Sequence, residues 1–255
     1  MNNTSNLIEE MNAIDVKERV DKDTIAILIF VACENHGDNM PFGSDFIFPL
    51  ELSKRISSKI RNTIIFPPIP YGVSLHHDSY QLTMSLRNQT LIYVIEDLLN
   101  SLIKHKIKNI FIINGHDGNI SPIEIASRNI KNVNPEITIA CIESWWTLVG
   151  QINPNLFKIW HGLGHGGEGE TSAMLAVRPD LVNLNNASEE TIPNLPKYIR
   201  IYWNFDELTN SGSTGAPRKA TPQKGNTILT ILEKEIISFL LSMESTSWKY
   251  GKCLN

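Results

Sequence analysis

The sequence has little cysteine, and its three cysteines show no pairing pattern. Cys33, Cys141 and Cys253 are an odd number, and no two of them have CxxC spacing. This argues against a disulfide framework and against a structural zinc site built on thiolates. We therefore expect reduced cysteines, with Cys33 packing as a small hydrophobic residue at the end of an apolar stretch.

Long apolar runs and an excess of basic residues are also absent. No apolar run reaches the roughly 18 residues of a membrane span, and the polar start MNNTSNLIEEMN lacks the basic and apolar zones of a signal peptide. The formal charge is -4, with no stretch of five or more like charges, so nothing favours binding to phosphates. We expect a cytoplasmic protein that binds neither nucleic acid nor a membrane.

What is present is a chain of 255 residues with an apolar fraction of 42%, enough for a sizeable core. No repeat at a fixed period is visible, so we predict a single domain over 1–255. The stretch 24–33 is apolar on both faces, as parallel strands covered by helices are. We predict strands over 24–33, 62–72, 107–116 and 136–144, and helices over 46–60, 90–106, 121–133, 170–179 and 226–243.

This alternation of strands and helices predicts an α/β fold with a mainly parallel sheet flanked by helices on both faces. Ser121 is the expected cap of the helix over 121–133, with Pro122 in its first turn. The strand within 62–72 should be short, because Pro67 and Pro68 should end it. In such sheets ligands gather beyond the carboxyl ends of the strands, where the polar clusters described next are found.

The first polar cluster directly follows the strand over 24–33. ENHGDNMPFGSD places Glu34, His36 and Asp45 within a dozen residues. Glu34 and His36 are two residues apart in an extended stretch and project to the same side, and Asp45 can return after the turn. The simpler interpretation, equally open on the pattern alone, is a turn in which Asp45 caps the helix that starts at Phe46.

The second cluster is INGHDGN, which places His116 at the end of the strand over 107–116. A lone histidine in a loop is usually ordinary, but this one is framed by glycines and by Asn and Asp residues. Because the carboxyl ends of parallel strands meet at one edge of the sheet, His116 can lie beside the first cluster.

Two further clusters carry histidines and glutamates. HGLGHGGEGETS contains His165, Glu168 and Glu170 among five glycines just before a predicted helix. It has the order of neither the HExxH zinc motif nor a P-loop, and the simpler interpretation is a flexible glycine loop. YGVSLHHDSY contains His76 and His77, one of which could be an ordinary surface residue.

Together the clusters offer nitrogen and oxygen ligands and no thiolate, a set that suits zinc, manganese or iron. A carboxylate, most plausibly that of Asp45, could bridge two ions about 3.5 to 4 Å apart, as in hydrolases with a shared hydroxide. A serine nucleophile fits less well because the chain has no G-x-S-x-G, and a nicotinamide site fits less well because G-x-G-x-x-G is missing.

The succession of motifs ENHG, PFGSD, PIPYGVSLHH, NGHDGN and HGGEGETS resembles the creatininase (creatinine amidohydrolase) family of metal-dependent amidohydrolases. The resemblance implies a creatininase-like fold, a homo-oligomer that is commonly a hexamer built from dimers, and two divalent metal ions, zinc or manganese or both, with iron as a further option. It implies that Glu34, Asp45 and His116 hold one ion, and that His36, Asp45 and a further glutamate hold the second.

The chain departs from creatininase itself at two positions. Creatininase has a glutamate two residues after the histidine of the glycine turn, where this chain has Gly118. Glu170 is our substitute ligand, with Glu168 as the alternative. The family pattern also has a glutamate where this chain has His76. His165 matches the family's catalytic histidine, which would pass a proton to the leaving nitrogen.

The resemblance predicts an enzyme that cleaves a non-peptide C–N bond (amide, formamide or cyclic amide) of a small molecule with a metal-bound hydroxide. The alternatives are a formylaminopyrimidine nucleotide deformylase, a peptidase of a modified-peptide precursor, or a non-catalytic small-molecule binding protein on this fold. Trp145, Trp146 and Trp160 could form a wall around a flat substrate, or could equally be core or interface residues. We assign substrate contacts to His77, Asp117, Trp146 and Trp160.

Overall fold

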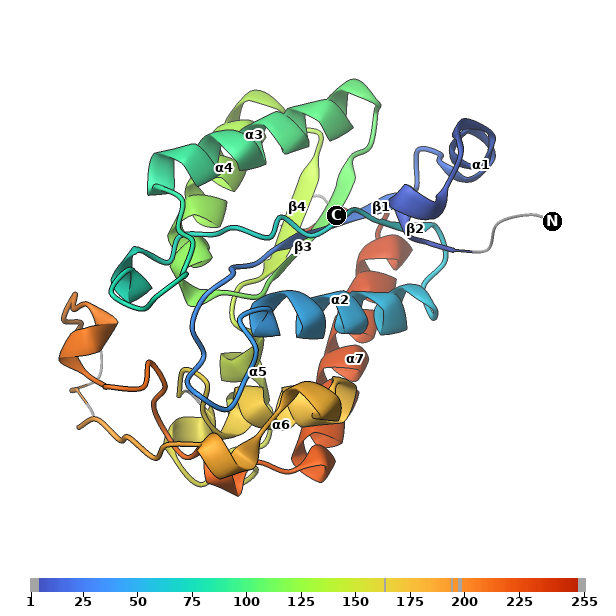
Figure 1. The fold of residues 1–255 in the computed structure, drawn as a ribbon. Coiled ribbons are helices and arrows are strands. Elements are labelled where there is room, and N and C mark those ends of the chain that lie inside the picture. The colour runs from blue at the N-terminus through green and yellow to red at the C-terminus, as the bar shows by residue number, and fades with distance from the viewer. Residues whose placement is uncertain (1–4, 163, 194, 197–198, 252–255) are drawn as a thin grey trace.

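A parallel sheet forms the centre of the molecule (Figure 1). The computed structural model describes residues 5–251 apart from Leu163, Asn194, Lys197 and Tyr198, and without the side chain of His161. In this part of the chain every neighbouring pair of strands is parallel, in the spatial order β2-β1-β3-β4. The strands are β1 (Ile25–Phe30), β2 (Thr63–Ile65), β3 (Asn109–Asn114) and β4 (Thr138–Ile142).

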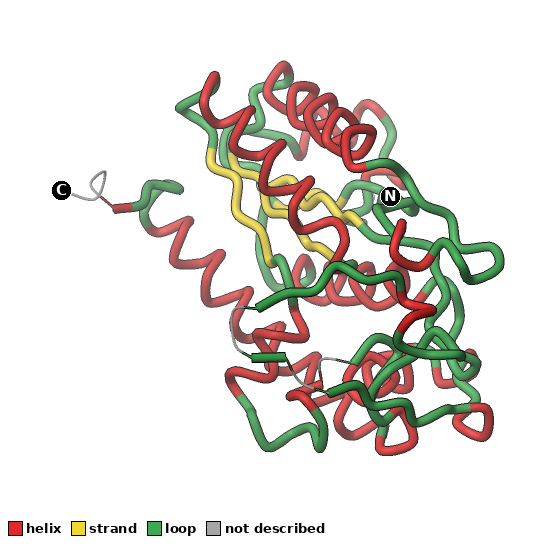
Figure 2. The backbone as a smooth tube through the Cα atoms, turned by 90° about the vertical axis from the view of Figure 1, so that its left-hand side faces the viewer, coloured by secondary structure: helices red, strands yellow, loops and turns green. Residues whose placement is uncertain are grey.

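Helices cover both faces of the sheet, as Figure 2 shows. The pair α3 and α4 packs on one face, and α2, α5, α6 and α7 pack on the other. The α-helices of the described residues are α1 (Ala13–Arg19), α2 (Ser44–Ser57), α3 (Asn88–Lys104), α4 (Ile120–Val133), α5 (Trp145–Ile152), α6 (Glu168–Val177) and α7 (Pro222–Ser245). The predicted α/β fold class is confirmed.

The apolar sequence of β1 explains its central position. All six of its residues are buried. Ile27 and Ile29 face the core under α2 and α7, whereas Leu28 and Phe30 face the core under α3 and α4. Successive side chains of a strand point to opposite faces, so a strand that is apolar throughout can serve two cores at once.

The loops that follow β1, β2 and β3 are joined at the carboxyl edge of the sheet. Phe30 pairs with Asn114 in the register of β1 and β3, so these two strands end side by side. The Asn119 side chain accepts a hydrogen bond from the Val73 N–H at 2.9 Å and donates one to the Val31 carbonyl at 3.2 Å. One amide therefore holds three loops together where the polar clusters lie.

Several local predictions need correction. The helix expected over 46–60 begins at Ser44. By contrast, the short strand expected within 62–72 is confirmed as the three residues of β2, which end before Pro67 and Pro68 as predicted, because proline cannot donate to the ladder. Ser121 does not cap α4, which begins one residue earlier at Ile120 without any side-chain cap.

Two helices were not predicted, α1 and α5. Among the described residues, none of the helices combines the length and the apolar character that crossing a bilayer requires.

Candidate metal centre

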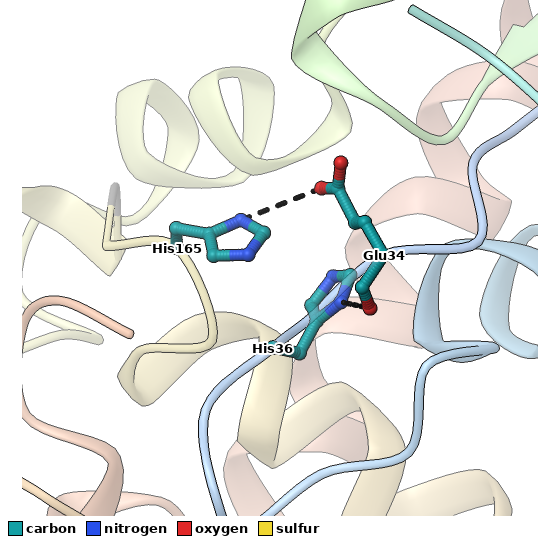
Figure 3. Close-up of side chains that lie close together, drawn as sticks. All are labelled: Glu34, His36 and His165. Carbon is teal, nitrogen blue, oxygen red and sulfur yellow. Dashed lines mark hydrogen bonds and ion pairs between the residues drawn. The ribbon is translucent and has the colours of Figure 1, made fainter. Parts of the chain in front are cut away.

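The chain leaves β1 in an extended stretch that carries Glu34 and His36. Both side chains are fully buried, at 0% exposure. The chain turns at Gly37, whose φ of +80° suits glycine, and the Asn35 side chain accepts the Gly37 N–H at 2.7 Å. His36 Nδ1 lies 3.1 Å from the Glu34 carbonyl oxygen (Figure 3), and it donates because a carbonyl can only accept.

The Asp45 carboxylate lies between two histidines. It projects from the first turn of α2 and is 5% exposed. Its Oδ1 is 2.9 Å from His36 Nε2, and its Oδ2 is 3.3 Å from His116 Nδ1. The α2 N-cap residue is Gly43, which makes no side-chain cap, so Asp45 does not cap the helix. The two oxygens of one carboxylate therefore serve two neighbouring groups.

His116 is held in one orientation by its second nitrogen. His116 Nε2 lies 2.9 Å from the Val73 carbonyl oxygen, to which it must donate. His116 Nδ1 then faces the carboxylates, 3.1 Å from Glu34 Oε1. A ligand histidine whose far nitrogen is fixed by a carbonyl is a common arrangement around protein-bound metals.

The glycine-rich segment 161–172 supplies two glutamates with different surroundings. Glu170 accepts the Gly166 N–H at 2.6 Å and lies beside His36 and Asp45. Glu168 is bound elsewhere: it forms an ion pair with Lys224 and accepts the N–H of Lys158 at 2.7 Å. Position in the structure therefore favours Glu170 over Glu168 as a ligand.

Three groups of side chains in the described part of the chain have ligand atoms within 4.8 Å of one another. Two of them match the sets expected from the family resemblance, and both contain Asp45. The third group lacks Asp45 and combines one residue from each of these two sets with His165. The groups are Glu34, Asp45 and His116; His36, Asp45 and Glu170; and Glu34, His36 and His165.

The two glutamates give a matched pair of variants. If the centre holds the two ions that the family resemblance implies, Glu170→Gln should lose one of them, because a neutral amide is a poor ligand, while it can still accept the Gly166 N–H. Glu168→Gln should keep both ions but lower the free energy of unfolding by about 1.5–3 kcal/mol, since it weakens charged hydrogen bonds. Metal analysis and urea denaturation measure the two effects. Full metal content in Glu170→Gln would exclude this ligand.

Electrostatics show that the buried carboxylates depend on positive partners. Burial raises the pKa of Glu34, but the neighbouring histidines, His116 foremost, outweigh it and hold the value well below the usual range. Burial lowers the pKa of His36, but Asp45 outweighs it and raises the value to about 10. Burial also raises the pKa of Glu170 to about 7. The buried carboxylates therefore need positive charge next to them. Bound protons supply this charge when no metal ion is bound.

His165 lies against this cluster. Its Nε2 donates to the Asn35 carbonyl at 2.6 Å, and its Nδ1 is 3.8 Å from Glu34 Oε1 (Figure 3). The His165 and His36 ring centroids are 4.4 Å apart. Burial and the charge of His36 lower the pKa of His165 to about 4. Nδ1 is therefore the free nitrogen and faces the candidate centre.

The residues assigned to substrate lie in different places. His77 is buried, with its ring centroid 4.3 Å from that of His165. Asp117 is exposed at the start of the turn η3 (Asp117–Asn119). Trp146 packs edge-on against Trp145, at 5.6 Å, and against the core, the alternative that the sequence left open. Trp160 is partly buried in the turn η4 (Trp160–Gly162). Their contacts with substrate stay predictions.

Two residues at the site were missed in the sequence. Asn35 acts through its backbone carbonyl on His165, which no side-chain pattern reveals. Phe205 lies against His77, with ring centroids 4.1 Å apart, although it is distant in the chain. In the sequence, Phe205 is only an aromatic residue in a long segment without regular structure, and no motif marks it.

The chain folds as an α/β protein with a parallel sheet, and buried carboxylates and imidazoles gather at the carboxyl edge of that sheet. The fold and the site together define an α/β protein with a candidate metal centre. The family model described as Creatininase: Creatinine amidohydrolase matches residues 9–240, and the chain belongs to the creatininase family. Creatinine amidohydrolase from Pseudomonas putida is 26% identical over 224 residues, 82% of this chain and 85% of that protein. The mycofactocin precursor peptide peptidase of Mycobacterium ulcerans is 22% identical over 220 residues, 80% of each chain.

Solved creatininase structures share the fold. A manganese form superimposes with a TM-score of 0.81 and 25% identity, covering 94% of this chain and 98% of that chain. A mutant described as a zinc–zinc type has a TM-score of 0.82 and 24% identity over the same shares. The creatininase-like fold expected from the sequence is confirmed, and relatives of this fold include zinc and manganese forms.

Proposed function

We propose that this chain is a metal-dependent amidohydrolase that cleaves a non-peptide C–N bond of a small molecule. The observation that carries this proposal is the position of Asp45, whose two oxygens face His36 and His116 and so join two sets of ligands. A carboxylate shared by two cations about 3.5–4 Å apart is a feature of two-metal hydrolases. Membership of the creatininase family supports the same class of reaction.

The residues present fit a pair of divalent ions. Both carboxylate oxygens of Glu34 and Oδ2 of Asp45 are buried and lack a hydrogen-bond partner. Buried charged oxygens of this kind need a cation or a donor. Glu34, Asp45 and His116 would hold one ion, and His36 and Glu170 would complete the second set with Asp45. The nitrogen and oxygen donors suit zinc or manganese.

The chain's own residues would orient the reaction and move its proton. Two bound ions would supply a water of lowered pKa and polarise the substrate carbonyl. His165 Nδ1 faces the centre, and burial lowers the pKa of this imidazole and favours its neutral form, so Nδ1 can accept a proton there. It would then return this proton to the leaving nitrogen, which an amide requires in order to depart. The Asn35 carbonyl keeps the ring turned for this transfer.

Gly118 supports Glu170 as the glutamate of the second ligand set and weighs against creatinine as the substrate. A Cβ atom added at Gly118 would lie 2.0 Å from the Val73 carbonyl oxygen and 2.7 Å from His116 Nε2. These distances leave no room for a glutamate unless the backbone moves. The ligand that creatininase carries at this position must therefore come from another part of this chain, and Glu170 lies within reach.

Other substrates within the family remain alternatives. The likeness to a mycobacterial mycofactocin precursor peptide peptidase favours a modified-peptide precursor as the second candidate. A formylaminopyrimidine nucleotide and a non-catalytic binding role complete the set. We also propose a cytoplasmic homo-oligomer, a hexamer by family resemblance, which light scattering of the purified protein would test.

Metal loading together with a substrate screen tests the proposed function. Protein incubated with zinc or manganese should hold about two ions per chain. It should hydrolyse members of a panel of formamides, lactams and cyclic ureas, and EDTA should abolish that activity until metal is restored. Less than one tightly held ion per chain, with no activity gained on adding metal, would contradict the proposal and favour a binding protein.

A further inference from the structure

Among the candidate ligand side chains in the described part of the chain, those of His165 and Glu170 are the most exposed to solvent. The His165 side chain is 14% exposed, and Glu170 is also only partly buried. The side chains of Glu34, His36, Asp45, His77 and His116 are exposed by 5% or less, whereas His76, which stacks on His116, is partly buried. Of the groups in the three candidate ligand sets, His165 and Glu170 are therefore the ones that a substrate can reach from solvent.

Phe205 lies beside one of these groups, His165. Its ring stacks on His77 at a centroid distance of 4.1 Å and an angle of 30°, and stands edge-on to His165 at 5.1 Å and 71°. It also lies 6.1 Å from the His76 ring. Phe205 begins the short turn η7 (Phe205–Glu207), in the orange segment of Figure 1. One partly buried phenyl ring therefore contacts three histidines next to the centre.

The segment that carries Phe205 is closed into a local turn and is anchored to other loops on the C-terminal side of the ring. The Glu207 carboxylate accepts the Asn204 N–H at 2.8 Å, which closes the turn. The Tyr80 hydroxyl donates to the Thr209 carbonyl at 2.6 Å, which ties the segment to the loop of His76 and His77. Further along, the Thr214 N–H donates to the His165 carbonyl at 2.8 Å. The ring is thus held in place and does not hang from a free loop.

We propose that Phe205 is a specificity-determining residue, which limits the group on the substrate's leaving nitrogen to a small or flat one. This inference rests on the proposed function. If the substrate carbonyl lies at the metal ligands and its nitrogen near His165, the nitrogen substituent must lie against Phe205, which stands edge-on to that histidine. Because His77 covers one face of the ring, a planar substituent would stack on the opposite face, whereas a branched one would meet the ring.

Binding of metal-chelating hydroxamates to the zinc-loaded protein tests this without a known substrate. The probes are acetohydroxamate and its N-phenyl and N-tert-butyl derivatives, with Kd measured by calorimetry. The wild type should bind the N-tert-butyl compound at least about tenfold more weakly than acetohydroxamate, as expected for a pocket that discriminates by size. It should bind the N-phenyl compound about two- to tenfold more tightly than Phe205→Leu does, because stacking is lost in that variant.

Phe205→Ala should remove most of the penalty against the N-tert-butyl group while zinc content stays unchanged. Tyr80→Phe, which deletes only the hydroxyl that ties the segment, should relax the same penalty in part. An unchanged ratio between the N-tert-butyl compound and acetohydroxamate in Phe205→Ala would overturn the inference, as would equal weakening of all three probes. If the wild type binds no acetohydroxamate and no zinc, the proposed function itself fails and takes this inference with it.

Discussion

Asp45→Ala should remove both metal ions at once and reduce hydrolysis to the background of the assay. Each oxygen of this carboxylate faces a different histidine, so one substitution takes a ligand from both sets. Without the ions, no water of lowered pKa is available at neutral pH. Metal analysis by mass spectrometry should give well under one ion per chain.

The same substitution should also destabilise the metal-free protein. His36 and His116 are buried and share Asp45 as a partner, and removing one member of a buried charged pair typically costs about 3–5 kcal/mol. Asp45→Asn keeps the shape of the side chain and separates metal loss from unfolding, which circular dichroism would monitor. Asp38→Ala is the matched control, because Asp38 lies in the same loop and is exposed. Full metal content in folded Asp45→Asn would exclude a bridging role.

Much of the fold could be predicted from the apolar patterns of the sequence, because the strands and helices that these patterns indicate also form in the folded chain. The continuous apolar stretch of β1 predicted a strand covered on both faces, and the two cores confirm it. The cap of α4 could not be predicted, because the Asn119 side chain binds Val73 and Val31 across two other loops. Such use of a side chain depends on neighbours that are remote in the sequence.

The candidate site was predictable in its residue types and less so in its assignments. Strand-end positions placed Glu34 and His116 at one edge of the sheet, and the structure brings them within 3.1 Å. The choice between Glu168 and Glu170 could not be made from the sequence. It depends on Lys224 of α7, which forms an ion pair with Glu168. The position of Phe205 at the site could not be predicted, because only the folded chain brings its ring against the histidines.

His165→Ala should keep both metal ions and lower kcat by about 10²- to 10⁴-fold, the usual contribution of a positioned proton-transfer group. The reason is geometric: Nε2 is fixed on the Asn35 carbonyl, and Nδ1 faces the centre at 3.8 Å from Glu34 without completing either of the two sets that share Asp45. Metal analysis and turnover on a substrate found in the screen measure the two quantities on the same sample.

A competing role for His165 makes this variant decisive. The group of Glu34, His36 and His165 also has its ligand atoms within 4.8 Å, so this histidine could hold an ion itself. A ligand role predicts that His165→Ala loses about one ion per chain, whereas a proton-transfer role predicts unchanged metal with slow turnover. His105→Ala, on an exposed histidine at the end of α3, is the control for both readouts. Normal turnover with full metal in His165→Ala would contradict both roles, because a group that neither binds the ions nor moves the proton has no part in cleaving the C–N bond.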